Sequence, residues 1–278
     1  MRYRKRTLRI SAGEGRKLKL LILSPREEGK ERTGVLWIHG GGYITGMAGM
    51  VYMSRAMDLV RRYGAVVVSP AYRLAGEAPY PAALLDCHCA LVYLRDHAGE
   101  LGVRSDQLMV GGESAGGGLA AALCMYEKDR DGVDIAFQMP LYPMLDNQDT
   151  ATSRDNHAPV WNTKRNHYGW FRYLRGLPAG EVPCYAAPAR RRDYAGLPPA
   201  YTFVSTAEPF YAETLDYVDH LRGAGVVAEV DVYPGLFHAF DMLLPLLPAS
   251  RQAAERFRHH FAQAQGRCFA PQRDRGEG

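Results

Sequence analysis

One glycine-rich turn, Gly112-Glu113-Ser114-Ala115-Gly116, could present a serine hydroxyl for nucleophilic attack. An apolar run over 108–110 precedes the turn, and a helix-like run over 119–125 follows it. A strand, a tight turn and a helix form the context that a nucleophile elbow requires, with small residues on both sides of the strained serine. The five-residue pattern is weak evidence by itself, so the rest of the chain has to supply a base, an acid and oxyanion donors.

A serine hydroxyl needs an adjacent base, which an acid in turn holds in place. Of the nine histidines, His238 alone follows an expected strand (228–233) directly and lies in a loop after the serine. We therefore predict His238 as the base. Glu208 is the first carboxylate after another expected strand (200–205) and is predicted as the acid, with a helix cap as its structural alternative. Asp241 is the second choice for the acid, if the usual chain order of serine, acid and histidine is broken.

Three successive glycines, 40–42, follow an expected strand and could supply the oxyanion donors. Without a Cβ atom, their backbone N–H groups can converge on one point. We assign Gly41 and Gly42 to the oxyanion hole, together with the N–H of Ala115 behind the serine. A phosphate-binding loop is the rival interpretation, but no Gly-x-x-x-x-Gly-Lys-[Ser/Thr] pattern follows. His39 is expected to stabilise the glycine loop and not to act as a base.

The composition is that of an ordinary globular protein, with 47% hydrophobic and 23% charged residues and a net charge of +4. Basic runs near the N-terminus and at 190–192 predict solvated surface. Because they lack interleaved aromatic residues and a reader motif, we expect no nucleic-acid partner. The apolar run at 20–23 is too short for a signal peptide or a membrane span, so no stable membrane insertion is expected.

The cysteines predict a reducing environment and no metal site. Five cysteines without the spacing of a disulfide scaffold favour a cytoplasmic location. Cys87-His88-Cys89 resembles a metal-binding fragment, but it lies within an expected helix. Residues two apart on a helix point to different faces, and no second ligand pair occurs elsewhere, so neither a metal nor another cofactor is predicted.

The order of the expected elements predicts the α/β class and a single catalytic domain over 1–268, followed by a disordered tail over 269–278. An edge hairpin (7–12 and 17–24) comes first. Strands and helices then alternate, which demands a mostly parallel central sheet with right-handed crossovers and helices on both faces. The expected strands lie near 35–38, 65–69, 107–110, 135–140, 200–205 and 228–233, and the expected helices near 54–62, 81–98, 115–128, 210–222 and 250–265.

Residues 146–195 break this alternation and predict a small lid over the site. The insertion contains several aromatic residues at helix-like spacing. Three aromatic side chains are proposed as walls of the substrate pocket, namely Tyr43, Trp161 and Phe237. Packing in the core or the lid is the alternative for each of them.

Four motifs taken together resemble the hormone-sensitive-lipase-like branch of the α/β-hydrolases: His39-Gly40-Gly41-Gly42, Tyr72-Arg73-Leu74-Ala75-x-Glu77, Gly112-Glu113-Ser114-Ala115-Gly116-Gly117 and Gly235-Leu236-Phe237-His238-Ala239-Phe240. Leu197-Pro198-Pro199-Ala200 followed by Glu208-Pro209 is also similar to that family's lead-in to its acid. The resemblance spans about residues 33–265. It implies the α/β-hydrolase fold, the triad and oxyanion hole assigned above, and a cofactor-free carboxylesterase that cleaves small short-chain acyl esters through an acyl-enzyme on Ser114.

The chain departs from that family at three points. Glu208 stands where the acid is usually Asp, and Gly76 replaces the usual Pro. The N-terminal helical cap is reduced or absent, so the lid has to cover the site, which leaves it either more open or completed by a second subunit in a homodimer. An amidase or formamidase on the same triad stays open, as does a non-catalytic small-molecule receptor. Arg73 and Glu77 are expected to form a structural ion pair.

Overall fold

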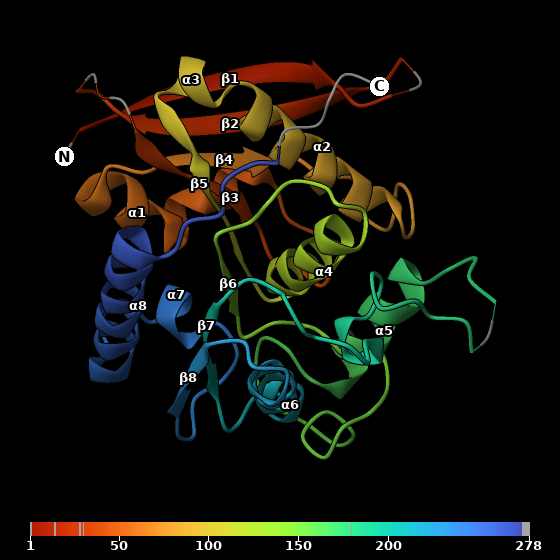
Figure 1. Ribbon diagram of the computed structural model, residues 1–278. Helices are drawn as coiled ribbons and strands as arrows, with labels where there is room; N and C mark the ends of the chain where they lie inside the picture. Colours follow the sequence, from red (N-terminus) through yellow and green to blue (C-terminus); the bar gives the residue numbers. More distant parts are fainter. Residues whose placement is uncertain (1, 14, 28, 30, 179, 274–278) are drawn as a thin grey trace.

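A computed structural model describes residues 2–273 except 14, 28, 30 and 179. One eight-stranded sheet runs through the molecule in the order β1-β2-β4-β3-β5-β6-β7-β8 (Figure 1). Neighbours from β4 to β8 are parallel, whereas β2 pairs antiparallel with both β1 and β4. The strands are β1 (Tyr3–Ser11), β2 (Lys17–Pro25), β3 (Arg32–Ile38), β4 (Val66–Pro70), β5 (Val103–Glu113), β6 (Phe137–Leu141), β7 (Ala200–Ser205) and β8 (Ala228–Tyr233).

Helices cover both faces of this sheet (Figure 1). Helices α1 and α8, with the 3-10 helix η1, pack on one face, while α2, α4 and α6 pack on the other. The helices are α1 (Ala56–Tyr63), α2 (Ala82–Asp96), α3 (Ala98–Leu101), α4 (Ala115–Asp129), α5 (Thr163–Tyr173), α6 (Tyr211–Gly223), α7 (Phe240–Leu243) and α8 (Pro248–Arg267), with the 3-10 helices η1 (Ala48–Met53) and η2 (Pro188–Arg190).

The central strands are short apolar runs because both of their faces are covered. Every residue of β4 and β6 is buried, and Val35 to Ile38 of β3 are fully buried. Such runs are typical of parallel strands between two helical layers. Because parallel strands end at the same edge of the sheet, the loops after β3, β4, β5, β7 and β8 meet there. That edge carries the four motifs of the sequence.

The predicted α/β-hydrolase fold is confirmed, including the antiparallel edge hairpin. Strands β7 and β8 have the expected bounds, while β5 begins four residues earlier than predicted, at Val103 instead of 107. The expected long helix near 81–98 ends at Asp96, and the short α3 follows it. Helix α7, directly after the histidine loop, was not expected, because a four-residue helix has too few turns to show a period.

The C-terminal tail is only partly described. Residues 269–273 belong to the stretch expected to be disordered, yet Ala270 N–H donates to the carbonyl of Asp106 at 2.7 Å. The Gln272 side chain also donates to the carbonyl of Asp134 at 2.8 Å. Residues 274–278, the rest of the expected tail, lie outside the described residues.

Arg73 pairs with Asp86 and not with Glu77, which corrects the expected ion pair. The fully buried Asp86 carboxylate accepts from the Arg73 Nε at 3.0 Å and Nη2 at 2.9 Å, and also from its backbone N–H at 2.9 Å. Arg16 from the β1–β2 turn contacts the same carboxylate. A buried carboxylate is tolerated where several donors surround it. The sequence alone does not show that α2 places the Asp86 carboxylate beside Arg73.

None of the helices within the described residues is both long enough and apolar enough to cross a membrane.

Candidate active site

Ser114 lies at the sharp turn between β5 and α4, with φ 58° and ψ −122°. This strained conformation holds only where no side chain obstructs the turn. A Cβ atom on Gly112 would approach the carbonyl oxygen of Ile38 to 2.4 Å, and one on Gly116 would approach it to 2.1 Å. Both glycines are therefore required by the close passage of β3 beside the turn. The serine also begins α4, whose N-terminal end favours developing negative charge.

The structure brings the three predicted triad residues into one hydrogen-bonded chain. Ser114 Oγ lies 2.8 Å from His238 Nε2. The other ring nitrogen, His238 Nδ1, contacts Glu208 Oε2. All three side chains are buried, with relative exposures of 6%, 3% and 0% for Ser114, His238 and Glu208. A serine, a base and an orienting acid in this sequence of contacts can generate an alkoxide nucleophile.

Glu208 is oriented by the strand that precedes it. Its second oxygen, Oε1, accepts the backbone N–H of Ser205 at 2.7 Å. The N-cap of α6 is Phe210, and no side-chain cap bond forms there, so the structure does not use Glu208 as the helix cap considered above. Ser205 also joins the acid to the histidine loop, because its Oγ accepts from Leu236 N–H at 2.8 Å. Glu208 and His238 are thus held by loops that are bonded to each other.

Two aromatic rings enclose the base. Tyr142 and Phe210 meet the His238 imidazole edge-on, with ring centroids 5.1 and 5.0 Å away. The sequence analysis did not assign either residue. Phe210 directly follows Glu208-Pro209, and Tyr142 follows β6 at the same edge of the sheet, so position after a strand was the available signal. These rings exclude water from the imidazole and fix its orientation.

The glycine loop turns back on itself beside the serine. Gly41 and Gly42 have φ of 122° and 59°, and the Gly41 carbonyl accepts the N–H groups of Ile44 and Thr45, both at 3.1 Å. In the described part of the chain, no acceptor is bonded to the N–H groups of Gly41, Gly42 or Ala115. Donors left free beside a nucleophile can stabilise an oxyanion.

His39 supports the glycine loop as a neutral group. Burial lowers its pKa to about 4, although a bond to the Gly40 carbonyl partly opposes that shift. Its ring stacks on Tyr72 with centroids 4.2 Å apart, and the Tyr72 hydroxyl donates to the His39 carbonyl at 2.9 Å. A neutral, stacked imidazole outside the triad is a structural support, as predicted.

A cavity of ≈ 1280 Å³ opens above Ser114 and His238. The lid contributes Trp161, Tyr168 and neighbouring residues of α5, and the body contributes Met50 of η1 and Met242 of α7. Residues between 155 and 168 therefore form one side of the cavity, and a lid over 146–195 stays a prediction. Trp161 is the one proposed wall residue that lines it.

Tyr43 and Phe237 do not line this cavity, which corrects two of the proposed pocket walls. Tyr43 has φ 62°, and its buried ring turns inward to stack on Tyr173 at 3.9 Å, with its hydroxyl donating to the Met144 carbonyl at 3.1 Å. Phe237 packs against the core on the face of α1 and α8. A residue next to a catalytic or oxyanion residue in the sequence lies on the same loop, but its side chain can point away from the cavity.

Two buried carboxyl groups, Glu113 and Asp241, lie next to the triad. Burial raises the pKa of Glu113 to about 8, although a 2.8 Å bond from Trp37 Nε1 partly opposes the shift. Asp241, the second choice for the acid, is fully buried and lies 3.2 Å from Arg55 Nε. Because Glu208 and not Asp241 contacts His238 Nδ1, the geometry favours Glu208 as the acid.

The described residues contain no cluster of three or more His, Cys, Asp or Glu side chains that could hold a metal ion. All five cysteines are free thiols. His88, from the Cys-His-Cys fragment, instead contacts Glu127 of α4.

The chain is similar to known esterases over most of its length. A family model described as the α/β hydrolase fold matches residues 35–242. Esterase LipI of Mycobacterium tuberculosis is 31% identical over 224 residues, 80% of this chain and 70% of the relative. A solved bacterial heroin esterase has a TM-score of 0.86 and 32% identity, with 95% of this chain and 83% of that chain covered. Esterase LipW from Mycobacterium marinum has a TM-score of 0.87 and 32% identity, with coverages of 94% and 82%.

These relatives are named as esterases, which supports ester hydrolysis and gives no support to an amidase or a receptor. The matched region contains Ser114, Glu208 and His238. The chain belongs to the hormone-sensitive-lipase-like carboxylesterases of the α/β-hydrolase family, and it is a carboxylic ester hydrolase.

Proposed function

We propose that this esterase hydrolyses short-chain acyl esters through an acyl-enzyme on Ser114, with Glu208 and His238 completing the triad. One observation carries the proposal: Ser114 Oγ lies 2.8 Å from His238 Nε2, at the floor of a large cavity. In the proposed first step, His238 Nε2 takes the Ser114 proton while Oγ attacks the ester carbonyl. The negative charge then falls on the carbonyl oxygen, beside the free N–H groups of Gly41, Gly42 and Ala115.

The second half of the proposed cycle regenerates the serine. His238 returns its proton to the leaving alcohol, which departs and leaves an acyl-enzyme. A water molecule next gives its proton to His238 and attacks the acyl carbon, after which Ser114 leaves with the histidine's proton. Glu208 stabilises the imidazolium formed in each half. No step calls for a cofactor.

The preference for short acyl groups is supported by the position of Trp161. A Cβ atom on Gly42 would lie only 2.0 Å from Trp161 Cη2, so the indole rests against the proposed oxyanion loop. A large ring beside the carbonyl site leaves little length for an acyl chain on that side. The remaining cavity is open to the alcohol portion, and its walls are rich in apolar side chains such as Met50 and Met242.

Hydrolysis of a graded series of p-nitrophenyl acyl esters tests this function. We expect turnover of acetyl to hexanoyl esters by the wild type, and loss of that turnover in Ser114→Ala, because the nucleophile is removed. Trp161→Ala should shift the preferred acyl chain to longer members of the series. Turnover by Ser114→Ala equal to that of the wild type would reject the assignment of the nucleophile.

We further infer a homodimer in a reducing, cytoplasmic environment. Five free cysteines support the reducing environment. The two edges of the sheet, β1 and β8, each pair with one neighbour only in the described chain, so either edge can accept a second copy. Light scattering on the eluting peak of a sizing column should give a mass near twice the 30.9 kDa of the chain, and a monomer at all concentrations would refute the dimer.

A further inference from the structure

Exposed apolar side chains gather at the mouth of the active-site cavity. Of the eleven large apolar side chains exposed among the described residues, eight lie on three segments: η1 with the residue before it, α5, and 243–246. Each segment also lines the cavity, through Met53, Tyr168 and Leu243 respectively. We define the apolar rim as Met47, Met53, Phe171, Leu243, Leu244 and Leu246, which are 42–77% exposed.

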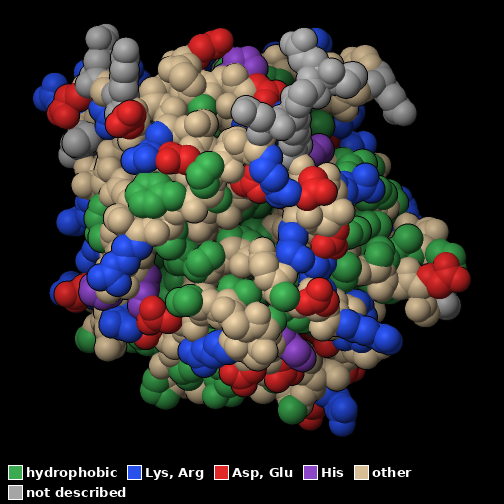
Figure 2. All heavy atoms as spheres, viewed as in Figure 1, with side chains coloured by type: hydrophobic (Ala, Val, Ile, Leu, Met, Phe, Trp, Pro, Cys, Tyr) green, Lys and Arg blue, Asp and Glu red, His purple; other side chains and the backbone are tan. Residues whose placement is uncertain are grey.

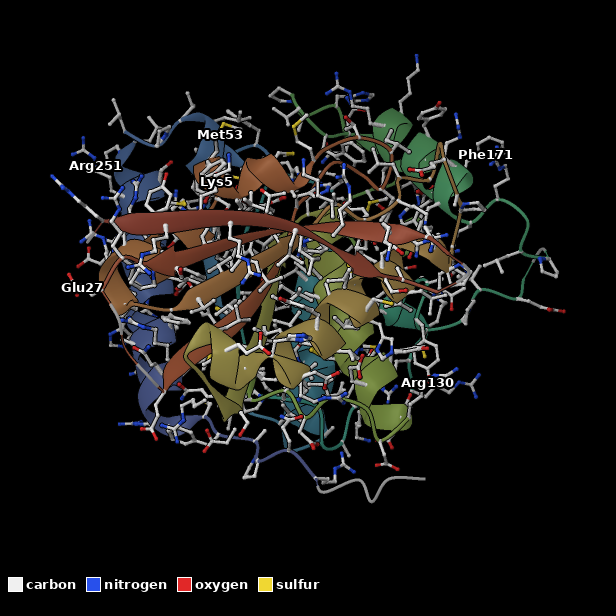
Figure 3. All side chains as sticks on the ribbon, turned by 90° about the horizontal axis from the view of Figure 1, so that it is seen from above. Lys5, Glu27, Met53, Arg130, Phe171 and Arg251 are labelled. Carbon is white, nitrogen blue, oxygen red and sulfur yellow. The ribbon has the colours of Figure 1, made fainter. Side chains whose placement is uncertain are left out.

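Such a concentration is not the usual scatter of apolar residues over a surface. Large apolar side chains exposed singly need no explanation, whereas a contiguous group around a binding cavity marks an interaction surface. In Figure 3, Met53 and Phe171 both lie in the upper half of the view, well apart from each other, and Arg130 lies below Phe171. Met53 and Leu243 line the cavity themselves, so the rim borders the opening of the cavity on the side of η1 and α7.

Basic side chains accompany the rim. Lys5 Nζ lies 5.9 Å above the ring of Tyr52 in η1, and Arg172 lies 5.8 Å above the ring of Tyr168 in α5. Lys164 lines the mouth, and the exposed Arg251 follows the rim at the start of α8. None of these four cations forms an ion pair within the described part of the chain.

Some of the acids around the mouth lie within ion-pair distance of a basic side chain or a histidine. Asp155 and Asp149 contact the exposed histidines His157 and His167, which carry a positive charge only when protonated. Asp58, near η1, lies within ion-pair distance of three arginines. On the face seen in Figure 2, by contrast, acidic and basic side chains are interspersed. Because Lys164 and Arg165 line the mouth, it combines apolar and basic side chains, which is complementary to an anionic and apolar partner.

We propose that the apolar rim and its four cations dock reversibly onto an anionic lipid surface, with the active-site mouth facing the lipid. Apolar side chains beside basic ones are the combination that binds a lipid–water interface without crossing it. The orientation delivers apolar esters dissolved in the lipid directly to the cavity. The delivery of substrate rests on the proposed function, whereas lipid binding itself does not depend on ester hydrolysis.

Binding is measured with Ser114→Ala protein, so that it is independent of catalysis. The probe is sedimentation with vesicles of phosphatidylcholine containing phosphatidylserine, compared with pure phosphatidylcholine. We expect partition onto the anionic vesicles that weakens as salt increases. Adding Arg251→Glu to this protein should lower the partition onto anionic vesicles by at least about fivefold. Each basic side chain near an anionic lipid surface strengthens binding by about that factor. Ester hydrolysis by the wild type in solution tests the proposed function separately.

The double change Met47→Ser with Leu246→Ser tests the apolar part. Neither side chain lines the cavity, so hydrolysis of a soluble ester should be unchanged, while partition onto vesicles should fall about tenfold. Val227→Ser is the matched control, because Val227 is 68% exposed and precedes β8, at the end of that strand opposite His238. Three outcomes would overturn the proposal: no partition at low salt, equal loss in the Val227 control, or a rim variant that dissociates a dimer without changing partition.

Discussion

Replacing Glu208 by Gln should remove most of the activity and leave the fold intact. Glu208 Oε1 accepts Ser205 N–H at 2.7 Å, and the glutamine oxygen can keep that bond. The glutamine NH₂ group must then face His238 Nδ1, because the reverse orientation would set two donors against each other at Ser205. Nδ1 is forced to accept, so the imidazole proton moves to Nε2, facing Ser114. A base that already carries its proton cannot take another, and the equivalent change in a serine protease lowers kcat about 10⁴-fold, which is ~5 kcal/mol.

The assay is steady-state hydrolysis of p-nitrophenyl butyrate by wild type, Glu208→Gln and Asp241→Asn, with thermal unfolding to verify that each protein is folded. KM should change little in Glu208→Gln, since the acid does not touch the substrate in the proposed mechanism. Asp241→Asn is the matched control, because Asp241 is also a buried carboxylate after β8 and was the second choice for the acid. A Glu208→Gln enzyme within tenfold of wild type, or a larger loss in Asp241→Asn, would refute the reasoning.

Three further changes test other parts of the structure. Gly42→Ala should lower kcat about 10²- to 10³-fold, because its Cβ atom would displace Trp161 and shift an oxyanion donor. Glu113→Gln should flatten the pH dependence of the free energy of unfolding between about pH 5 and 8. In the wild type, the Glu113 carboxyl keeps its proton up to about pH 8 when folded but loses it near its ordinary pKa when unfolded. The wild-type free energy of unfolding therefore falls as the pH rises through this range. Asp86→Asn should lower the free energy of unfolding by about 1.5–3 kcal/mol, because Arg73 loses a buried charged acceptor.

Each of these changes has its own measurement. Kinetics of Gly49→Ala provide the comparison for the glycine loop, since a Cβ atom there meets nothing closer than 3.9 Å. Urea unfolding at several pH values tests Glu113→Gln, and parallel slopes in the two proteins would contradict its raised pKa. Asp96→Asn is the comparison for Asp86, because Asp96 is a half-exposed member of an ion pair. Equal destabilisation by the two changes would show that burial of Asp86 is not what matters.

The parts of the fold that could be predicted from sequence were those set by local pattern. Buried parallel strands appear as short apolar runs between helical periods, and so β7 and β8 were located to the residue. The elbow could be predicted because its glycines are a steric requirement of the turn at Ser114. Chain order then selected His238 and Glu208, and the structure places both beside that serine.

Side-chain direction and long-range partners could not be predicted in this way. Nothing local shows that the positive φ of Tyr43 turns its ring away from the cavity, or that α2 delivers Asp86 to Arg73. The surroundings of His238 were also missed, because Tyr142 is brought to it by β6, which is separated from β8 by β7 in the sheet. Contacts across the sheet depend on strand order, and a single sequence gives strands without their order.

The residues that link the lid to the glycine loop indicate that the lid acts as a brace as well as a cover. The Tyr43 ring, from the glycine loop, stacks on Tyr173 of α5, and Trp161 rests against Gly42. A Cβ atom on Gly169 of α5 would lie 2.9 Å from the Gly42 carbonyl, so the helix approaches the loop backbone directly. Oxyanion donors are effective when their positions are fixed before the reaction. Since α5 packs on the loop that carries two of the proposed donors, movement of the lid would disturb them. Access to the site is therefore expected from the side of η1 and α7, while α5 stays in place.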